Sequence, residues 1–407
     1  MVNFDTPFSI DHSPFAMKVF FRRIHLYLSF AAGLVILIAC LTGALLVFEK
    51  DLQMAFRKER YYTNAAANAL PADSIINRVK TAYGGKVTGI KWYSDPARTV
   101  EVAVTMPKKK EEGAKPKPEG RAPGFTIFVD PYTGEIRDKY SYRETGWYTV
   151  FALHRWLLGS DGSVGKYIVG VSTLLFLFIL ITGVILWWPR TRKVLQQRLS
   201  IKWGASWKRL NHDLHIVLGF YSAILLFIVA FTGLAWSFEW MDKGIYKVTG
   251  SKKEAPKPPK SAFAEGAKAV PFGTVLAAAR GAQPGAQFYN VQAPKDSTGV
   301  FTVQVLPQHP VHESATDALY FDQYTAAPMG GLSYAQRSRG ARVRSTFKPV
   351  HTGSIGGWPT KVIAFIICLF GVSFPITGTV MWWNRTRKRR KDGKKVLMTE
   401  EMEDELA

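Results

Sequence analysis

The sequence predicts an α-helical membrane protein with four transmembrane helices in two parallel repeats, each carrying a small α+β domain outside the membrane. Four apolar runs without charged residues reach the roughly 20 residues that cross a bilayer core. The chain of 407 residues has a formal net charge of +22, and Lys and Arg concentrate in the short segments beside these runs. Two pairs of apolar runs also align on each other, which indicates an internal repeat.

The apolar runs define the expected order of segments along the chain. The predicted spans are 26–48, 167–188, 216–238 and 362–383. The short basic segments 1–25, 189–215 and 384–407 are predicted to be cytoplasmic, because Lys and Arg accumulate on that side. Both termini would then lie inside, and the long connections 49–166 and 239–361 outside.

The repeat is visible in both members of each span pair. His25 aligns with His215, and Thr42-Gly43 with Thr232-Gly233, at an offset of 190 residues. In the second pair, Thr182-Gly183 aligns with Thr377-Gly378 at an offset of 195. Two spans per unit preserve orientation, so the repeats should be parallel and related by an axis along the membrane normal.

Each external segment is expected to form a helix followed by strands. The expected elements are a helix at 70–83 and strands at 87–93, 99–106 and 124–129, then a helix at 274–280 and strands at 287–292, 299–306 and 318–322. The first set ends in the turn Asp130-Pro-Tyr-Thr-Gly-Glu135, whereas the second reads Asp322-Gln-Tyr-Thr-Ala-Ala327. The Lys- and Pro-rich stretches 107–119 and 252–260 are expected to be solvated loops.

Histidines at repeat-equivalent positions are the main candidates for chemistry. His25 and His215 begin spans one and three, and an imidazole there that faces the helix bundle is a good axial ligand for haem. His154 and His351 precede spans two and four and form a second pair near the outer face. The plainer interpretation is that these side chains bind lipid headgroups or solvent.

Several other residues leave alternatives open. His212 lies one helical turn before His215 and is its rival as a ligand, although its repeat position is Arg22. Arg155, like Lys166 and Lys348, would either pair with haem propionates or anchor the chain at the interface. The metal-compatible pair His309 and His312 is expected to lie in a solvated loop.

The cofactor type follows from what the sequence lacks. Only Cys40 and Cys368 occur, with no C-x-x-C-H motif, so two non-covalent haems b are expected. No glycine-rich nucleotide motif indicates a flavin or NAD module, so electrons would come from another molecule. No nucleic-acid partner is expected.

Several of these motifs together resemble a known family. The Asp-x-Tyr-Thr-Gly-Glu turn is similar to that of PepSY domains, and the chain from about Phe20 to Lys391 resembles the PepSY-associated transmembrane family. The most specific parts of the match are the histidines that begin spans one and three, the segments 153–159 and 348–353, and the Thr-Gly pairs. The resemblance implies a multi-pass protein of the bacterial inner membrane with two periplasmic domains. It also implies that some members of the family are di-haem reductases of ferric siderophores.

The expected function is electron transfer from the cytoplasm to a ferric siderophore or other ferric chelate in the periplasm, with release of Fe(II) for iron uptake. The donor would be a cytosolic flavin, a quinol or a reductase, and the chelate would be held between the external domains. Two alternatives stay open. In the first, the protein would be a cytochrome b subunit that serves another periplasmic reductase. In the second, it would be a membrane-anchored sensor or inhibitor whose PepSY-like domains bind peptides or proteases.

Overall fold

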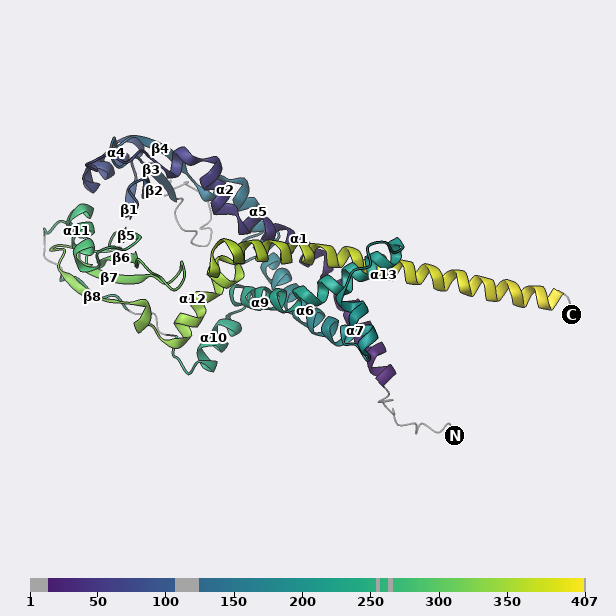
Figure 1. Ribbon diagram of the computed structural model, residues 1–407. Coiled ribbons are helices and arrows are strands. Elements are labelled where there is room, and N and C mark those ends of the chain that lie inside the picture. Colours follow the sequence, from purple (N-terminus) through teal and green to yellow (C-terminus); the bar gives the residue numbers. More distant parts are fainter. Residues whose placement is uncertain (1–13, 107–123, 254–256, 263–265, 406–407) are drawn as a thin grey trace, which may run out of the picture.

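The computed structural model describes residues 14–106, 124–253, 257–262 and 266–405 (Figure 1). Its helices confirm a multi-pass membrane protein. Four of them are long and apolar enough to cross a bilayer: Met17–Val47, Val164–Trp187, Trp207–Ser237 and Trp358–Arg387. The expected spans agree with these helices to within one residue at their C-terminal ends or lie inside them. The expected loop 107–119 lies outside the described residues, as do the first residues of the N-terminal segment 1–25.

The four long helices form one bundle. They comprise α1 (Pro14–Val47), α6 (Val164–Trp187), α9 (Gly219–Ser237) with the preceding α8 (Trp207–Asp213), and α13 (Trp358–Glu405). Helix α1 packs against α6 and α13, and α9 packs against the same two helices. Buried alanine and bulky aliphatic side chains fill the centre, among them Ala32, Ala230, Leu226 and Leu234. Small residues allow the close helix approach that membrane bundles depend on.

A π-helical turn, Leu214–Leu218, joins α8 to α9 and contains His215. The corresponding part of α1, around His25, is regular α-helix. A π turn inserts one residue into a helix and frequently marks a functional position. The second half of the chain therefore presents its histidine with a backbone geometry that the gapless sequence alignment does not predict.

Short helices connect the bundle to the sheet. They are α2 (Glu49–Phe56), α3 (Lys58–Tyr61), α5 (Gly146–Trp156), α10 (Glu239–Val248) and α12 (Arg339–His351), with α7 (Arg192–Leu199) at the opposite end of the bundle. Thr145 caps α5 by accepting a hydrogen bond from the Tyr148 amide, and Ser338 caps α12 in the same way through Ala341. His154 and His351 lie in the last turns of α5 and α12, so ordered helices hold both.

The strands of the two long connections form one antiparallel sheet. The strands are β1 (Lys86–Tyr93), β2 (Val100–Thr105), β3 (Gly124–Val129), β4 (Ile136–Tyr140), β5 (Phe288–Gln292), β6 (Val300–Leu306), β7 (Asp317–Asp322) and β8 (Pro328–Leu332). Their order is β4-β3-β2-β1-β5-β6-β7-β8, and β1 pairs with β5 so that Ile90 faces Val291. The two expected α+β domains are thus halves of a single eight-stranded sheet. Strands β4 and β8 were not predicted, because IRDKY and PMGGL lack apolar alternation.

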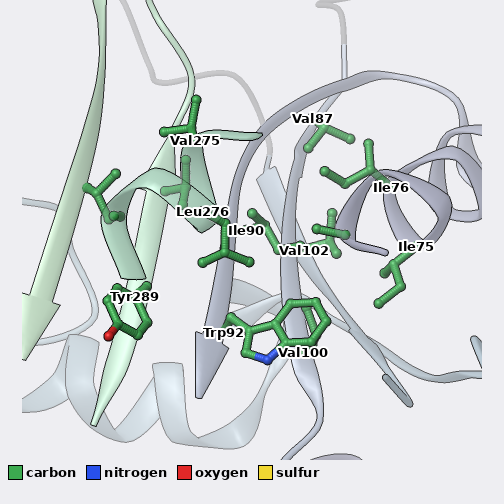
Figure 2. Packing of buried hydrophobic residues seen from close by; sticks show 14 of the residues in the cluster. Ile75, Ile76, Val87, Ile90, Trp92, Val100, Val102, Val275, Leu276 and Tyr289 are labelled. Atoms are coloured by element: carbon green, nitrogen blue, oxygen red, sulfur yellow. The ribbon is translucent and has the colours of Figure 1, made fainter. Parts of the chain in front are cut away.

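Helices α4 (Ala72–Tyr83) and α11 (Phe272–Ala282) cover one face of this sheet (Figure 2). Ile75 and Ile76 of α4 and Val275 and Leu276 of α11 pack into the same buried cluster as strand residues from both halves. Each such side chain contributes about 1.5–3 kcal/mol when fully buried. The Asp73 carboxylate also accepts the Gly273 amide at 3.1 Å, which caps α11 from the other half. One core therefore holds both halves together.

Candidate functional site

Each of the four repeat-equivalent histidines contacts a Thr-Gly pair on a neighbouring helix. His25 Nδ1 on α1 lies 3.0 Å from Thr182 Oγ1 and 3.1 Å from the Ile179 carbonyl oxygen, both on α6. His154 Nδ1 on α5 lies 3.1 Å from Thr42 Oγ1 and 3.0 Å from the Ala39 carbonyl oxygen of α1. The first half of the chain therefore places one histidine near each end of the bundle.

The second half repeats this arrangement. His215 Nδ1 lies 2.8 Å from Thr377 Oγ1 on α13. His351 Nδ1 on α12 lies 2.8 Å from the Val229 carbonyl oxygen and 3.3 Å from Thr232 Oγ1 on α9. All four threonines belong to the Thr-Gly pairs that the sequence singles out.

The glycine of each pair gives the imidazole room. In the first half, a Cβ atom placed on Gly183 would lie 3.4 Å from Cε1 of His25, and one on Gly43 would lie 3.3 Å from Cε1 of His154. In the second half, the corresponding distances are 3.3 Å from Gly378 to His215 and 3.1 Å from Gly233 to His351. Ordinary carbon–carbon contacts are about 3.5–4.0 Å, so any larger residue would push the ring away. Sequence analysis interpreted these pairs first as small-residue helix contacts and second as space for a haem. The structure shows that each one receives a histidine ring.

The hydrogen bonds fix the tautomer of the rings. Thr42, Thr182, Thr232 and Thr377 each donate their hydroxyl hydrogen to the backbone carbonyl four residues earlier, at 2.6–2.9 Å. The threonine oxygen can then only accept from histidine, and the backbone carbonyls can only accept as well. In His25, His154 and His351, whose Nδ1 also faces a backbone carbonyl, Nδ1 therefore carries the proton and Nε2 keeps its lone pair. Metal-bound histidines are held in this way, with the other ring nitrogen donating to a carbonyl or a similar acceptor.

Among the described residues, no hydrogen bond uses Nε2 of these four histidines. Each ring is only partly buried although it lies within the helix assembly. Burial lowers the pKa of His154 to about 4, and the neighbouring His351 adds to the effect. Burial lowers the pKa of His351 as well. The outer pair is consequently neutral at physiological pH, which is the state that binds metals.

The two outer histidines approach each other closely. The ring centroids of His154 and His351 lie 6.1 Å apart, with an angle of 64° between the ring planes. Taking about 2.0 Å for a metal–imidazole bond, as for zinc, two axial rings on one metal have centroids about 6 Å apart. The outer pair fits that separation. His25 and His215, held by Thr182 and Thr377, form the inner pair.

The two pairs lie far apart along the bundle. On α1, His25 belongs to the inner pair and Thr42 contacts the outer pair, and the two are 17 residues apart. The same separation holds between His215 on the π turn and Thr232 on α9. At about 1.5 Å per residue this corresponds to about 26 Å along the axis, close to the roughly 30 Å thickness of a hydrocarbon core. One pair of histidines therefore lies near each end of the bundle.

Polar groups without partners lie beside the outer pair. Arg155 Nε and Trp156 Nε1 are buried and make no hydrogen bond within the described part of the chain. Arg155 contacts the exposed Asp161 at 3.7 Å, and it lines a hollow of about 250 Å³ together with Trp236, whose ring lies 5.3 Å from that of His351. Lys166 and Arg344 also line the hollow, but they pair with Asp161 at 3.1 Å and Asp242 at 2.7 Å in the same wall. Arg155 Nε and Trp156 Nε1 are therefore the donors that suit the carboxylates of a macrocycle.

The remaining histidines lie elsewhere. The His212 side chain is 44% exposed and its Nδ1 lies 3.4 Å from Asp213, so it does not join His215 at Thr377. His312 is buried, with Nε2 3.0 Å from the Tyr334 hydroxyl and Nδ1 accepting the Ser314 amide. Both of its nitrogens are used, so the loop with His309 is no metal site. His12 lies outside the described residues.

A haem fits these donor sets better than a bare metal ion. Among the described residues, no group of three or more His, Cys, Asp or Glu side chains is placed to hold a metal ion. Two imidazoles per site match a metal whose other ligands come from a macrocycle. Sequence analysis missed several contacts of the histidine pairs, namely Trp236, Trp156 and the backbone carbonyls of Ile179, Ala39 and Val229. The only signal in the sequence that pointed toward these contacts was the recurrence of Thr-Gly.

The chain was also compared with known proteins. Comparison with curated proteins gave no match. The family model described as the PepSY-associated TM region matches residues 22–385, which include most of α1, all of α6 and α9, the first part of α13, the sheet and the four paired histidines. The chain therefore belongs to the PepSY-associated transmembrane family.

Proposed function

We propose that this protein holds two haems b and transfers electrons across the bacterial inner membrane to a ferric siderophore or similar ferric chelate in the periplasm. His25 and His215 would hold the inner haem, and His154 and His351 the outer one. The observation that carries the proposal is the fourfold contact in which a Thr-Gly pair holds Nδ1 of a histidine and leaves Nε2 free.

The residues of the site have separate tasks. The threonine oxygens and backbone carbonyls keep each imidazole in one tautomer and orientation, which also raises its basicity as a ligand. Arg155 and Trp156 offer donors to the propionates at the outer site. A bound haem b supplies a one-electron centre, whose potential the protein tunes through ligands and burial.

Topology supports the direction of transfer. The basic segment 189–215 and the described part of the C-terminal segment, 384–405, lie at the end of the bundle opposite the sheet (Figure 1). The positive-inside rule assigns that end to the cytoplasm. The sheet would then face the periplasm, above His154 and His351. A flavin, quinol or reductase inside would donate electrons. One electron converts Fe(III) in the chelate to Fe(II), which hard oxygen ligands bind less tightly.

The first test is haem content and electron transfer in purified protein. We expect two non-covalent haems per chain by pyridine haemochrome assay. In dithionite-reduced protein, a ferric trihydroxamate chelate should restore the oxidised haem spectrum, and ferrozine should capture Fe(II). The His351→Ala protein should keep one haem and lose most of this reaction, because the inner site lies about 26 Å from the outer one.

The outcomes separate the alternatives. Protein purified without any Soret absorbance would eliminate haem binding and favour a sensor or inhibitor that binds peptides or proteases. Two haems that no ferric chelate reoxidises would favour a cytochrome b subunit serving another reductase.

A further inference from the structure

One carboxylate lies half-buried just beyond the outer end of helix α1. Glu49 begins α2, two residues after α1 ends at Val47, and its repeat-equivalent position is Glu239. Glu49 follows Thr42, which contacts His154, by seven residues, or about 10 Å along a helix. Charges at this distance still interact, because the screening length is about 10 Å at 0.1 M salt and partly buried charges are screened less.

Neutral groups hold the Glu49 carboxylate. Its Oε1 accepts a hydrogen bond from Gln53 Nε2 at 3.0 Å, and its Oε2 accepts one from the Tyr142 hydroxyl at 3.4 Å. Gln53 Oε1 in turn accepts from the Tyr61 hydroxyl at 3.1 Å, which keeps the amide in the orientation that donates to Glu49. No ion pair within the described part of the chain includes Glu49.

The repeat-equivalent carboxylate is placed differently. The Glu239 side chain is 91% exposed, and its Oε2 lies 3.6 Å from Lys243 Nζ, one turn farther along α10. Burial disfavours the charged form of a carboxyl group, and of these two residues only Glu49 is half-buried. The chain therefore contains a natural control for Glu49 at the equivalent position.

Burial is also what dominates the proton affinity of Glu49. Burial raises the pKa of Glu49, against the hydrogen bonds from Tyr142 and Gln53 and the positive charge of Lys348 on α12, which lower it. Burial raises the pKa of Tyr142 and of Tyr140 on β4 as well, so both phenols stay neutral over the physiological range. Protonation near this end of α1 therefore concerns the carboxyl group and not the phenols.

The other charged groups near this carboxylate are paired or exposed. Asp51, in the same first turn of α2, pairs with Lys361 of α13 at 2.7 Å. Arg60, whose Nη1 lies 3.5 Å from the oxygen of the supporting amide, pairs with Asp138 at 2.6 Å. Lys50 is exposed. None of these groups takes the place of a direct partner for the half-buried carboxylate.

We propose that Glu49 takes up a proton when the outer haem is reduced and releases it when the electron passes to the acceptor. The inference rests on the proposed two-haem function. One electron arrives from the inner site and one proton from the water at the exposed side of Glu49, so the carboxylate becomes a carboxylic acid and the net charge of the site is unchanged. An ionised carboxylate repels the added electron, and protonation removes that repulsion. Glu49 thereby ties the potential of the outer haem to the pH outside the membrane.

The test is a redox titration of the haem-loaded full chain in detergent between pH 5 and pH 8. The absorption change of the outer haem is the one that His351→Ala removes. In wild type, the midpoint potential of this haem should fall as the pH rises, because Glu49 loses its proton and then opposes reduction. Glu49→Gln keeps the size and the hydrogen-bonding capacity of the side chain. Its potential should lie above that of wild type at pH 8, approach it as the pH falls, and lose most of the pH dependence.

Glu239→Gln is the matched control and should keep the pH dependence of wild type, including the part that haem propionates contribute. Infrared difference spectra of reduced against oxidised protein should show a protonated carboxyl band that Glu49→Gln lacks. Tyr142→Phe removes a hydrogen bond to the ionised form, so it should move the pH dependence to higher pH. Equal pH dependence in wild type and Glu49→Gln, or an equal loss in Glu239→Gln, would overturn this inference and leave the two-haem proposal intact. Protein without haem would overturn both.

Discussion

The two halves of the chain are nearly alike in the helix bundle but differ in the details of the sheet. In the bundle, both halves hold two histidines against two Thr-Gly pairs with nearly the same distances. In the sheet, the halves share the strand order but differ in the residues at the turns and at the helix ends. Each half supplies one histidine to each pair, so a change in one half would alter a pair that the other half also builds. The sheet imposes only packing and register, which many residues satisfy.

The largest expected effect comes from removing one histidine. His25→Ala or His215→Ala should lose the inner haem alone, and His154→Ala or His351→Ala the outer haem alone, because each site needs a ligand from both halves. Haem content should fall from two per chain to one in all four variants. The His212→Ala protein is the control and should keep both haems, since this side chain lies away from Thr377. Loss of the inner haem in that variant, with retention in His215→Ala, would contradict the symmetric assignment.

A second prediction concerns the one histidine that lacks a carbonyl partner. His25, His154 and His351 each contact a backbone carbonyl as well as a threonine, whereas within the described part of the chain Nδ1 of His215 contacts Thr377 alone. Thr377→Val should therefore weaken inner haem binding by about 10–100-fold, the usual effect of removing a ligand's supporting contact.

The matched variant for this prediction is Thr182→Val, on the other ligand of the same haem. It should weaken haem binding less, because the Ile179 carbonyl still accepts from His25 Nδ1. Both affinities can be measured by haem titration of the apoprotein. Equal losses in the two variants would show that the threonines act by packing instead of by hydrogen bonding.

The turns that follow β3 and β7 should differ in stability. Asp130 accepts the amides of Tyr132 and Thr133, a hydrogen bond from Thr63, and the Arg137 guanidinium at 2.8 Å. Asp322 accepts the equivalent amides but forms no ion pair with a described residue. We expect Asp130→Asn to lower the free energy of unfolding by about 2 kcal/mol and Asp322→Asn by about 1 kcal/mol or less. Thermal unfolding of the two variants in detergent checks the difference.

The same turn predicts a dependence on pH. Burial raises the pKa of Asp130, but hydrogen bonds from Thr63, Arg137 and the turn amides outweigh it and lower the pKa to about 2. A carboxyl with a lowered folded-state pKa stabilises the protein above its unfolded value near 4, and this contribution is lost as the pH falls toward 2. Between pH 4 and pH 2, wild type should lose more stability than Asp130→Asn. Parallel pH profiles would contradict this assignment.

The smallest expected effect concerns one backbone conformation. Gly134 has φ +71°, and Ala326 takes the left-handed conformation with φ +58° at the corresponding place in the second turn. A non-glycine residue there costs roughly 1–2 kcal/mol. Ala326→Gly should therefore raise the free energy of unfolding by about 1 kcal/mol. The opposite change, Gly134→Ala, should destabilise, because φ +71° strains a residue with a Cβ and the new Cβ would also displace the Arg78 guanidinium. Thermal unfolding of both variants shows whether the free energy of unfolding rises in Ala326→Gly and falls in Gly134→Ala.

The sequence by itself determined the four spans, because length and hydrophobicity alone decide whether a helix can cross a bilayer. It also identified four histidines and four Thr-Gly pairs as corresponding positions. It could not match each histidine to its threonine, since the contacts join α1 to α6, α5 to α1, the π turn to α13 and α12 to α9. Helix packing decides those partners, and it places His215 but not His212 against Thr377.

In the sheet, local patterns predicted six of the strands and both covering helices, because alternation reports which face of a strand is buried. The pairing of β1 with β5 came only from the tertiary structure. That contact joins residues about 200 positions apart, and the strand pattern of Lys86–Tyr93 does not specify which edge it will meet. The shared core depends on this one pairing, so it could not be predicted from the sequence of either half.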